Sequence, residues 1–269
     1  MDIGPIEVLA ALGQGARSNV MLVRREADGL RYALKVTNVG KSSERKYLGQ
    51  ARQEFRVLQR LDHPNIVRAY VIETETDWLL RPTRVKVLLE YVAGQTLDRL
   101  VSPGLGTLLR AFEQAADAIA YLHESGLLHA DIKPNNIMLG PEVVKVIDFG
   151  LSREVGEETG RLQGTPEYMS PETGSRKLVD VRTDIFSFGA TMYRLLTGQY
   201  PPQSAGSFPM TERAWRDRYQ PATEANQALP DSVGLLVDRC LRFDPAERPA
   251  SMDEVCRELN RIVDDIGSP

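Results

Sequence analysis

The spacing of hydrophobic and polar positions changes about a third of the way along the chain. Up to about residue 90, short apolar or alternating runs are broken by Gly, Asp or Asn, a pattern typical of β-strands. Five such runs occupy residues 8–12, 20–24, 32–36, 66–72 and 85–90. One helical pattern interrupts them at residues 46–61, where Phe55, Leu58 and Leu61 recur at helical spacing. This part is therefore predicted to be rich in strands, with one main helix.

After Gly94 the periodicity is that of helices. Residues 107–124 carry one apolar face, and Gly126 is the predicted end of this helix. Further helical patterns cover residues 183–197, 231–242 and 251–265, whereas residues 127–175 are predicted to be loop and short strand. A strand-rich lobe followed by a helical lobe predicts an α+β fold with a cleft near residues 90–94, and clefts between lobes are common ligand sites.

The composition is that of an ordinary globular protein, with 269 residues, 42% hydrophobic and 26% charged. The net charge of −4 and the pI of about 5.6 disfavour a general binder of nucleic acid or anionic membranes. No apolar run reaches the roughly 18–20 residues of a membrane span, and the N-terminus lacks the pattern of a signal peptide. We therefore expect a cytoplasmic chain without nucleic-acid partner or membrane segment, although a longer parent protein with an anchor elsewhere is compatible with this pattern.

Cysteine usage agrees with that compartment. Cys240 and Cys256 fall in the late helical patterns and are interpreted as two thiols in a reducing environment rather than as a disulfide. The sequence leaves the oligomeric state open.

A glycine-containing segment lies between the first two predicted strands and reads Leu12-Gly13-Gln14-Gly15-Ala16-Arg17-Ser18-Asn19-Val20. Glycines allow backbone amides to approach phosphate oxygens without an intervening side chain. A plain hairpin turn explains Gly13 and Gly15 about as well. A strand follows the segment where a dinucleotide fold would have a helix, so that fold is disfavoured.

Lys35 lies inside the apolar strand at residues 32–36. Such a lysine is usually an edge residue whose head group reaches solvent. The functional alternative needs a carboxylate partner, and Glu54 on the predicted helix is the candidate. A Lys35–Glu54 pair could hold nucleotide phosphates. Glu44 is the competing acid, but its segment is predicted to be loop.

The densest chemistry lies at residues 129–136, which read His-Ala-Asp-Ile-Lys-Pro-Asn-Asn. Asp131 is a candidate base for a hydroxyl proton, and Lys133 could neutralise a moving phosphoryl group. Asn136 and, after a short apolar strand at 143–147, Asp148 of Asp148-Phe149-Gly150 offer hard oxygen ligands of the kind that Mg²⁺ prefers. Each could be a solvated loop residue taken alone, whereas the ordered set favours a working site.

In this order of motifs the sequence resembles the protein kinase superfamily, and within it the eukaryotic-like serine/threonine kinases of bacteria. The resemblance covers roughly residues 8–262. It implies a bilobal α+β kinase fold that forms one catalytic domain. An antiparallel sheet lobe with one main helix would span about residues 1–92, and a mainly α-helical lobe about residues 93–269.

The resemblance also implies a nucleotide site. Glu90-Tyr91-Val92 is similar to the hinge whose backbone grips adenine, with Leu89 as gatekeeper. Met138 would lie under the adenine ring, and Ala33 and the segment 12–20 would complete the ATP contacts. The implied cofactors are ATP and Mg²⁺, with Mn²⁺ as an alternative metal.

Several later motifs are those of a kinase that accepts protein substrates. Residues 164–172, Gly-Thr-Pro-Glu-Tyr-Met-Ser-Pro-Glu, resemble the end of an activation segment, and residues 184–189 resemble the buried helix that anchors the catalytic loop. Arg248 would pair with Glu172. Lys133 is the serine/threonine form of the loop, and Thr165 is positioned to bridge Asp131 and Lys133. The implied reaction is transfer of the ATP γ-phosphoryl group to Ser or Thr hydroxyls of proteins.

Ala130 is the main departure from the family pattern, since an arginine usually stands there. That arginine needs a negative partner, which a phosphate on the activation loop commonly supplies. Alanine has no charge to satisfy, so we hypothesise activity without activation-loop phosphorylation. Of the three hydroxyl residues in this loop, Ser152, Thr159 and Thr165, the last is interpreted as structural.

Three alternatives remain for the function. A pseudokinase scaffold would be expected to lose Lys35, Asp131, Asn136 or Asp148, and all four are present. A small-molecule phosphotransferase of the same broad fold would lack the segment 164–172. A nucleotide-sensing module would bind ATP without transferring phosphate.

One region before the hinge has no assigned role. Residues 73–86 are predicted to be a long connection between two strands. Trp78, Leu79 and Leu80 within it are expected to pack locally, with docking of a partner as the alternative.

Overall fold

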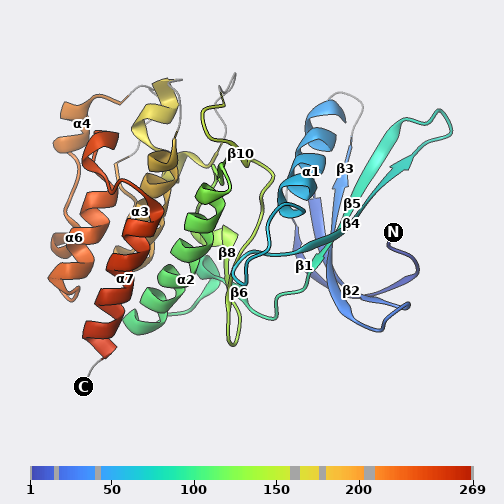
Figure 1. Cartoon of the computed structure of the whole chain (residues 1–269), viewed down its shortest axis with the longest axis horizontal. Helices are drawn as coiled ribbons and strands as arrows, with labels where there is room; N and C mark the ends of the chain where they lie inside the picture. Colours follow the sequence, from blue (N-terminus) through green and yellow to red (C-terminus); the bar gives the residue numbers. More distant parts are fainter. Residues whose placement is uncertain are drawn as a thin grey trace. The chain divides into compact units, whose positions relative to one another are not determined.

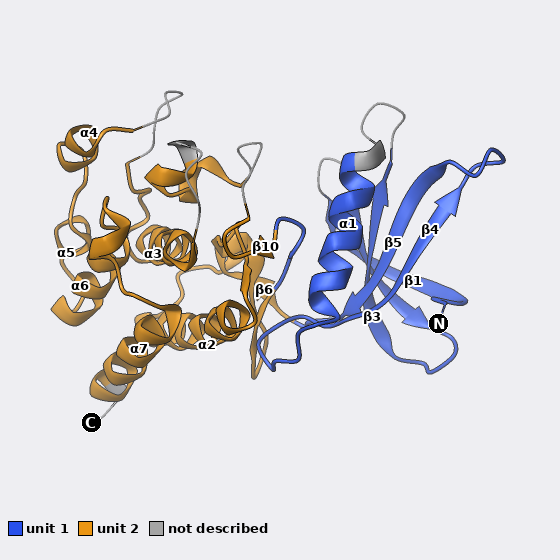
Figure 2. Ribbon diagram, turned by 45° about the horizontal axis from the view of Figure 1, so that its top comes forward, with its two compact units in different colours: residues 1–93, 147–151 blue, residues 94–146, 152–269 orange. Residues whose placement is uncertain are grey.

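The computed structural model describes residues 2–14, 18–39, 44–157, 164–175, 180–202 and 210–267. The chain forms two compact units (Figure 2), unit 1 with residues 1–93 and 147–151, and unit 2 with residues 94–146 and 152–269. The family-typical fold class is confirmed: unit 1 is built on an antiparallel sheet, and unit 2 is mainly helical. The cleft expected near residues 90–94 stays a prediction.

Unit 1 contains a five-stranded sheet in the order β1-β2-β3-β5-β4, with every neighbouring pair antiparallel. Its strands are β1 Ile6–Gln14, β2 Ser18–Arg25, β3 Arg31–Asn38, β4 Ala69–Thr76 and β5 Pro82–Glu90. The helix α1, Glu44–Leu58, packs on β3, β5 and β4. A buried cluster that includes Val23, Leu34 and Leu88 holds the strands together. Three consecutive residues are buried on β3 (residues 32–34) and on β5 (residues 87–89), so both faces of the sheet are covered at its centre.

Three sequence predictions in unit 1 were wrong. The fourth strand begins at Ala69, because Ile66 and Val67 form a buried loop whose apolar character imitates a strand. Residues 73–86 are no long connection: β4 continues to Thr76 and β5 begins at Pro82, so only residues 77–81 connect them. Glu44 begins α1 and is not part of a loop.

Unit 2 is built around four longer helices, with shorter elements between them (Figure 1). These helices are α2 Leu105–Glu124, α3 Val181–Thr197, α6 Asp231–Cys240 and α7 Met252–Gly267. The shorter ones are α4 Glu212–Arg216 and α5 Ala222–Ala225. Helix α2 packs against α7, and α3 packs against α6. The paired short strands are β6 Gln95–Thr96 with β8 Ile137–Leu139, β8 with β9 Val144–Val146, and β7 Leu127–Leu128 with β10 Arg153–Glu154.

Helix α3 is the most buried helix of unit 2, and its ends follow the usual capping rules. The Asp180 carboxylate accepts a hydrogen bond from the Arg182 amide, and Gly198 ends the helix with a φ of 72°. A Cβ atom at Gly189 would lie 2.6 Å from the Cβ of Cys240 on α6. Only glycine therefore permits this close approach of α3 and α6.

The remaining sequence expectations concern membranes and cysteines. Within the described parts of the chain, no helix has both the length and the apolar character needed to cross a bilayer. Cys240 and Cys256 are both buried free thiols, and burial raises their pKa values to about 12 and about 11. They are therefore inert packing residues at neutral pH.

Candidate active site

Lys35 on β3 is the centre of a charged cluster in unit 1. Its Nζ lies 2.8 and 2.9 Å from the two carboxylate oxygens of Glu54 on α1, and 2.9 Å from Oδ1 of Asp148. Glu54 is almost completely buried, whereas the Asp148 side chain is 45% exposed. The expected Lys35–Glu54 contact is therefore present, and Asp148 joins it as a second acid. Lys35 is consequently no edge lysine that reaches solvent.

The three charges shift one another's proton affinity. Burial alone would lower the pKa of the Lys35 ammonium, but the attraction of Glu54 and Asp148 outweighs it and raises that pKa. Burial raises the pKa of the Glu54 carboxyl, and Lys35 opposes this rise. A lysine held by two acids stays charged at neutral pH. Lys35 is thus a fixed positive charge inside unit 1.

Asp148 also has an unusual backbone. Its φ is 64°, in the left-handed region that residues other than glycine rarely adopt, although aspartate tolerates it better than most. The next residue, Phe149, is completely buried. Non-glycine residues in this region are often found at functional sites, where the surrounding structure holds them.

The glycine-containing segment is mostly strand. Leu12, Gly13 and Gln14 end β1, and Ser18, Asn19 and Val20 begin β2, so the expected loop is shorter than predicted. Gly15, Ala16 and Arg17 lie outside the described residues. The register of the pairing between β1 and β2 shifts between Ala11 and Gly13. A cavity of about 390 Å³ is lined by residues 11–14 and 19–21 of this hairpin.

The residues predicted to contact adenine are placed in both units. Ala33 and Leu89 are buried partners across β3 and β5, and Glu90 ends β5. The Glu90 amide donates a hydrogen bond to the Arg68 carbonyl at 2.8 Å. A nucleotide contact from the Glu90 backbone would therefore use its carbonyl oxygen. Val92 follows in unit 1, and Met138 lies on β8 in unit 2.

Asp131 is the centre of a second charged cluster, in unit 2. Its Oδ2 accepts a hydrogen bond from Lys133 Nζ at 2.6 Å, and its Oδ1 accepts one from Thr165 Oγ1 at 2.8 Å. Thr165 Oγ1 in turn accepts from Lys133 at 2.8 Å. The predicted bridge by Thr165 is therefore present. It fixes the Asp131 carboxylate and the Lys133 ammonium in one geometry.

Asn136 completes this second cluster. Its Nδ2 donates to the Asp131 carbonyl oxygen at 2.8 Å and to Oδ2 of Asp131 at 3.3 Å. Both bonds use the amide nitrogen of Asn136. Its Oδ1 atom is therefore the one that Asn136 can offer to a cation. No group of three or more His, Cys, Asp and Glu side chains in the described ranges could hold a metal. A metal would therefore be held by oxygen atoms of one or two protein residues together with oxygen atoms of a bound molecule such as a nucleotide.

Asp184 on α3 holds the backbone of the loop that carries Asp131. Its buried carboxylate accepts hydrogen bonds from the amides of His129 at 2.7 Å and Ala130 at 2.9 Å, and from His123 Nε2 at 3.0 Å. Burial alone would raise the pKa of Asp184, but these donors outweigh it and hold the pKa below its ordinary value. Asp184 is therefore ionised, and it fixes the backbone of His129 and Ala130 in the loop that carries Asp131. Sequence reasoning missed His123, whose polar ring on the buried side of α2 was the available signal.

Ala130 is held in a strained conformation by these bonds. Its φ is 65°, so a non-glycine residue occupies the left-handed region in the loop that carries Asp131. Arg153 on β10 was not singled out in the sequence. It is buried, its Nε has no hydrogen-bond partner, and burial lowers the pKa of its guanidinium against the attraction of Asp184 and Glu157. A cation thus remains in this part of unit 2, although position 130 carries none.

Arg248 and Glu172 form the expected ion pair. Arg248 Nη1 and Nη2 lie 2.7 and 2.9 Å from the two Glu172 oxygens, in a bidentate arrangement. Arg248 also donates to the carbonyl oxygens of Arg182, Arg242 and Phe243, and it lies over the Phe186 ring. The Arg248 guanidinium is buried, and these hydrogen bonds and the ion pair satisfy it. It ties the end of the segment 164–172 to the helical core of unit 2.

The comparisons with known proteins agree with this geometry. Residues 6–259 match the family model described as protein kinase domain. The chain belongs to the protein kinase family. That match covers both charged clusters and all the site residues predicted from the sequence.

Bacterial kinases are among the relatives of this kinase domain. Serine/threonine-protein kinase PksC of Streptomyces coelicolor is 31% identical over 97% of this chain and 49% of its own length. PknB of Mycobacterium tuberculosis is 31% identical over 93% of this chain and 42% of its own length. Serine/threonine-protein kinase pkn2 of Myxococcus xanthus is 30% identical over 95% of this chain and 32% of its own length. The chain thus spans about a third to a half of the curated relatives it matches.

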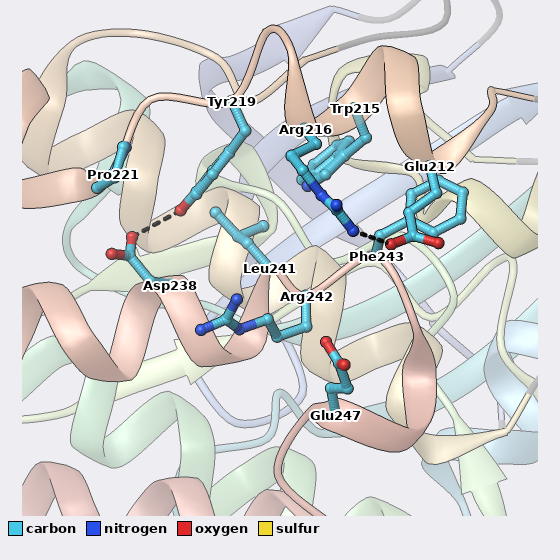
Figure 3. A pocket seen from close by; sticks show the side chains of 10 residues that line it. All are labelled: Glu212, Trp215, Arg216, Tyr219, Pro221, Asp238, Leu241, Arg242, Phe243 and Glu247. Atoms are coloured by element: carbon cyan, nitrogen blue, oxygen red, sulfur yellow. Dashed lines mark hydrogen bonds and ion pairs between the residues drawn. The ribbon is translucent and has the colours of Figure 1, made fainter.

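The kinase domain has a further cavity in unit 2, of about 270 Å³, which Figure 3 shows with its lining side chains. Its polar groups largely satisfy one another. Tyr219 donates to Asp238 at 2.6 Å, and Arg216 lies at 2.5 Å from Glu212. Trp215 stacks on the Tyr219 ring with a centroid distance of 5.5 Å. These contacts explain the aromatic and charged side chains of the cavity as packing within unit 2, so the cavity adds nothing to the site.

Proposed function

We propose that this chain transfers the γ-phosphoryl group of ATP to Ser or Thr hydroxyls of protein substrates. The observation that carries the proposal is the complete set of hydrogen bonds in both clusters, Lys35 with Glu54 and Asp148, and Asp131 with Lys133. Membership of the protein kinase family and the printed names of the relatives as serine/threonine-protein kinases support it. A pseudokinase would not need both sets of charged contacts, and the burial of Glu54 with its lysine partner costs free energy.

The chemistry asked of the protein is mainly positioning and neutralisation of charge. In this proposal Asp131 orients the substrate hydroxyl and accepts its proton. Lys133 offsets the charge on the moving phosphoryl group, and its bond to Thr165 keeps it in place. Lys35 binds nucleotide phosphates, and Glu54 holds Lys35 in position for this contact. The residues 12–20 would cover the phosphates and exclude water.

The proposed metal is Mg²⁺, with Mn²⁺ as the alternative. Asn136 and Asp148 would supply its protein ligands, through an amide oxygen and a partly exposed carboxylate. Both are hard oxygen donors, which fits a small divalent cation. The metal, when bound, neutralises charge on the phosphates. The cluster around Lys35 carries one positive and two negative groups, so it also has a surplus negative charge that would favour a cation.

The most direct test of the acceptor is to identify which amino acid carries the phosphate after transfer from labelled ATP. The 269-residue chain is incubated with labelled ATP and Mg²⁺, beside Asp148→Ala, with a generic basic protein as substrate. We expect label on phosphoserine or phosphothreonine with the wild type and none with the variant. ATP binding without transfer by the wild type would favour a sensor or scaffold, and label on tyrosine alone would contradict the acceptor.

A finer part of the proposal is activity without activation-loop phosphorylation. Ala130 carries no charge, and the anions that act on the nearby Arg153 are Asp184 and Glu157 of the chain itself. No added phosphate is therefore needed to balance a cation beside the loop. Ser152 is buried, and Thr165 is occupied by Asp131 and Lys133. This argument leaves Thr159, which lies outside the described residues, as the hydroxyl to test.

The test compares Thr159→Ala with wild-type protein that has been treated with a phosphatase. Both should retain most of the untreated activity, because the proposed site lacks an arginine that requires phosphate. Thr165→Ala serves as a positive control for loss, since it removes the bridge between Asp131 and Lys133. A large loss in Thr159→Ala or after dephosphorylation would overturn this part of the proposal and leave the transfer reaction itself intact.

A further inference from the structure

The hairpin between β4 and β5 ends in an exposed apolar tip, residues 77–81. Trp78 is 87% exposed, Leu79 46% and Leu80 81%. The expectation that these three residues pack locally was therefore wrong. The pairing of β3 with β5 ends at Arg84, whereas β4 and β5 pair as far as Pro82. The tip thus projects past β3, as the free end of the ribbon in Figures 1 and 2 shows.

The turn is held by the Asp77 side chain and by hydrogen bonds within its own backbone. Asp77 Oδ1 accepts hydrogen bonds from the amides of Leu79 and Arg81, both at 2.9 Å. The Asp77 amide donates to the Arg81 carbonyl at 2.9 Å, and the Leu80 amide donates to the Asp77 carbonyl at 3.0 Å. This is the hydrogen bonding of an Asx turn, which fixes a loop without help from other side chains. The backbone of the turn is therefore fixed, and its apolar side chains are exposed to solvent.

The backbone conformation of Leu80 is unfavourable for a leucine. Its φ is 59°, a left-handed conformation that suits glycine and strains a leucine. Its side chain is exposed, so packing within the fold does not offset the strain. Exposed apolar side chains beside one another usually mark an interaction surface. The strain and the exposure together indicate that this leucine serves a contact outside the fold.

The charges near the tip indicate which kind of surface it meets. Each acidic side chain of the ribbon is used internally: Glu73 accepts from the Ile3 amide, Glu75 pairs with Lys86, and Asp77 caps the turn. Arg81 is exposed, and its guanidinium makes no hydrogen bond or ion pair with any residue in the described ranges. A cation beside three apolar groups complements a surface with anionic head groups above an apolar layer.

The size of the tip argues against a protein partner. A stable protein interface covers about 800 Å² on each partner, and one aromatic side chain buries about 150–250 Å². Trp78 and two leucines on a narrow turn fall short of that area. A lipid surface needs no matching shape, and Trp and Leu with a nearby Arg are typical of segments that insert at the boundary of head groups and acyl chains.

We propose that residues 78–81 insert into the head-group layer of an anionic phospholipid membrane. Trp78 and Leu80 enter the apolar boundary, and Arg81 lies at the lipid phosphates. The net charge of −4 gives no general attraction to such a membrane. Binding therefore depends on this tip, and it places the kinase domain at a membrane surface independently of its catalytic residues.

The emission of Trp78 reports this insertion directly. The chain has two tryptophans, and the other, Trp215, is only 5% exposed in unit 2. With vesicles of phosphatidylcholine and phosphatidylglycerol we expect a blue shift of emission, quenching by brominated acyl chains, and co-sedimentation of the protein. Arg81→Gln should weaken binding to these vesicles and change little with phosphatidylcholine alone.

Leu80→Gly is the decisive variant, because glycine suits the backbone at this position and the fold is preserved. We expect at least about tenfold weaker partition into vesicles, since the variant lacks the leucine side chain that would be buried in the bilayer. Leu30→Ser is the matched control: Leu30 is 59% exposed in a turn of the same sheet, where its amide donates to Asp28. It should bind vesicles as the wild type does.

Three results would overturn the proposal. The first is the absence of any vesicle binding by the wild type, and the second is equal binding by Leu80→Gly. The third is a blue shift that grows with protein concentration in the absence of lipid, which would assign the tip to contacts between copies of the chain. Phosphate transfer in solution tests the proposed reaction separately, because no tip residue belongs to either charged cluster.

Discussion

The two charged clusters of the kinase domain differ in how their charges balance. In unit 1, one ammonium, Lys35, faces two carboxylates, Glu54 and Asp148, so the cluster carries a surplus negative charge. In unit 2, Asp131 faces Lys133, and the neutral hydroxyl of Thr165 joins them. The first cluster therefore keeps a net negative charge, whereas the second is balanced as it stands.

This difference suits two separate tasks. A cluster with surplus negative charge and a fixed lysine can take a metal and the phosphates that accompany it. A balanced cluster can hold a carboxylate ready for a neutral hydroxyl without binding an ion in its place. We therefore interpret the Lys35 cluster as the part that binds the nucleotide phosphates. In the second cluster, Asp131 and Lys133 handle the acceptor, and Asn136 is the one side chain that we assign to the metal.

Removal of the lysine should have the largest effect on this division. Lys35→Met leaves Glu54 and Asp148 as two unpaired acids, and we expect about a hundredfold loss in kcat/KM for ATP, as for loss of a single group that stabilises developing charge. The initial rate of transfer at varied ATP measures it. Lys86→Met is the control, because Lys86 lies in the same sheet but pairs with Glu75 at the surface. Equal losses in both variants would contradict the assigned role.

The bridge in the second cluster should have a smaller effect. Thr165→Val removes the hydroxyl that bonds both Asp131 and Lys133, and we expect about a tenfold lower kcat with little change in KM for ATP. Thr165→Ser keeps the oxygen and should restore most of kcat. A rise in KM for ATP as the main effect of Thr165→Val would show that the two clusters do not divide the work as described.

Asp184 provides a test through stability and pH. Asp184→Asn should lower the free energy of unfolding by at least about 3 kcal/mol at pH 7, because the buried donors lose an ionised acceptor. The pKa of Asp184 is held below its ordinary 3.8, so its contribution is present above that pH and is lost as the pH falls through the folded-state value. The urea midpoints of wild type and variant should therefore converge as the pH falls below 3.8. The exposed Asp231→Asn serves as control, and a constant difference at all pH values would contradict the assignment.

The smallest expected effect concerns Ala130, the strained position in the loop that carries Asp131. Ala130→Gly should raise the free energy of unfolding by up to about 1 kcal/mol, because glycine adopts a φ of 65° without strain. Ala118→Gly, in the middle of α2, should lower it by a similar amount. Thermal unfolding of the two variants measures both. A destabilised Ala130→Gly would mean that the alanine methyl group packs in a way that outweighs its backbone strain.

Much of the site was predictable from the sequence, because it depends on the identity and order of residues. Asp131, Lys133, Asn136 and Asp148 stand in motifs whose spacing is specific. The contact of Lys35 with Glu54 followed from a lysine in a buried strand and an acid on the one helix nearby. The fold class followed from the change of period near Gly94, which marks a change from sheet to helix.

The errors have local physical causes. Ile66 and Val67 read as a strand because burial in a loop and burial in a sheet require the same residue types. Thr74, Glu75 and Thr76 read as a connection because half-exposed ribbon strands lack an apolar face. The strain at Leu80 and the burial of Arg153 depend on backbone angles and neighbours that no sequence pattern encodes. These are also the positions where the structure adds something new.

One measurement tests the division between the clusters most directly: ATP affinity and phosphate transfer of Asp131→Asn in the same sample with Mg²⁺. Asn keeps the size of the side chain and removes its ability to take a proton. The account predicts ATP affinity close to that of the wild type and turnover lower by at least about a hundredfold. Turnover near that of the wild type, or a loss of ATP binding as large as that of transfer, would contradict it.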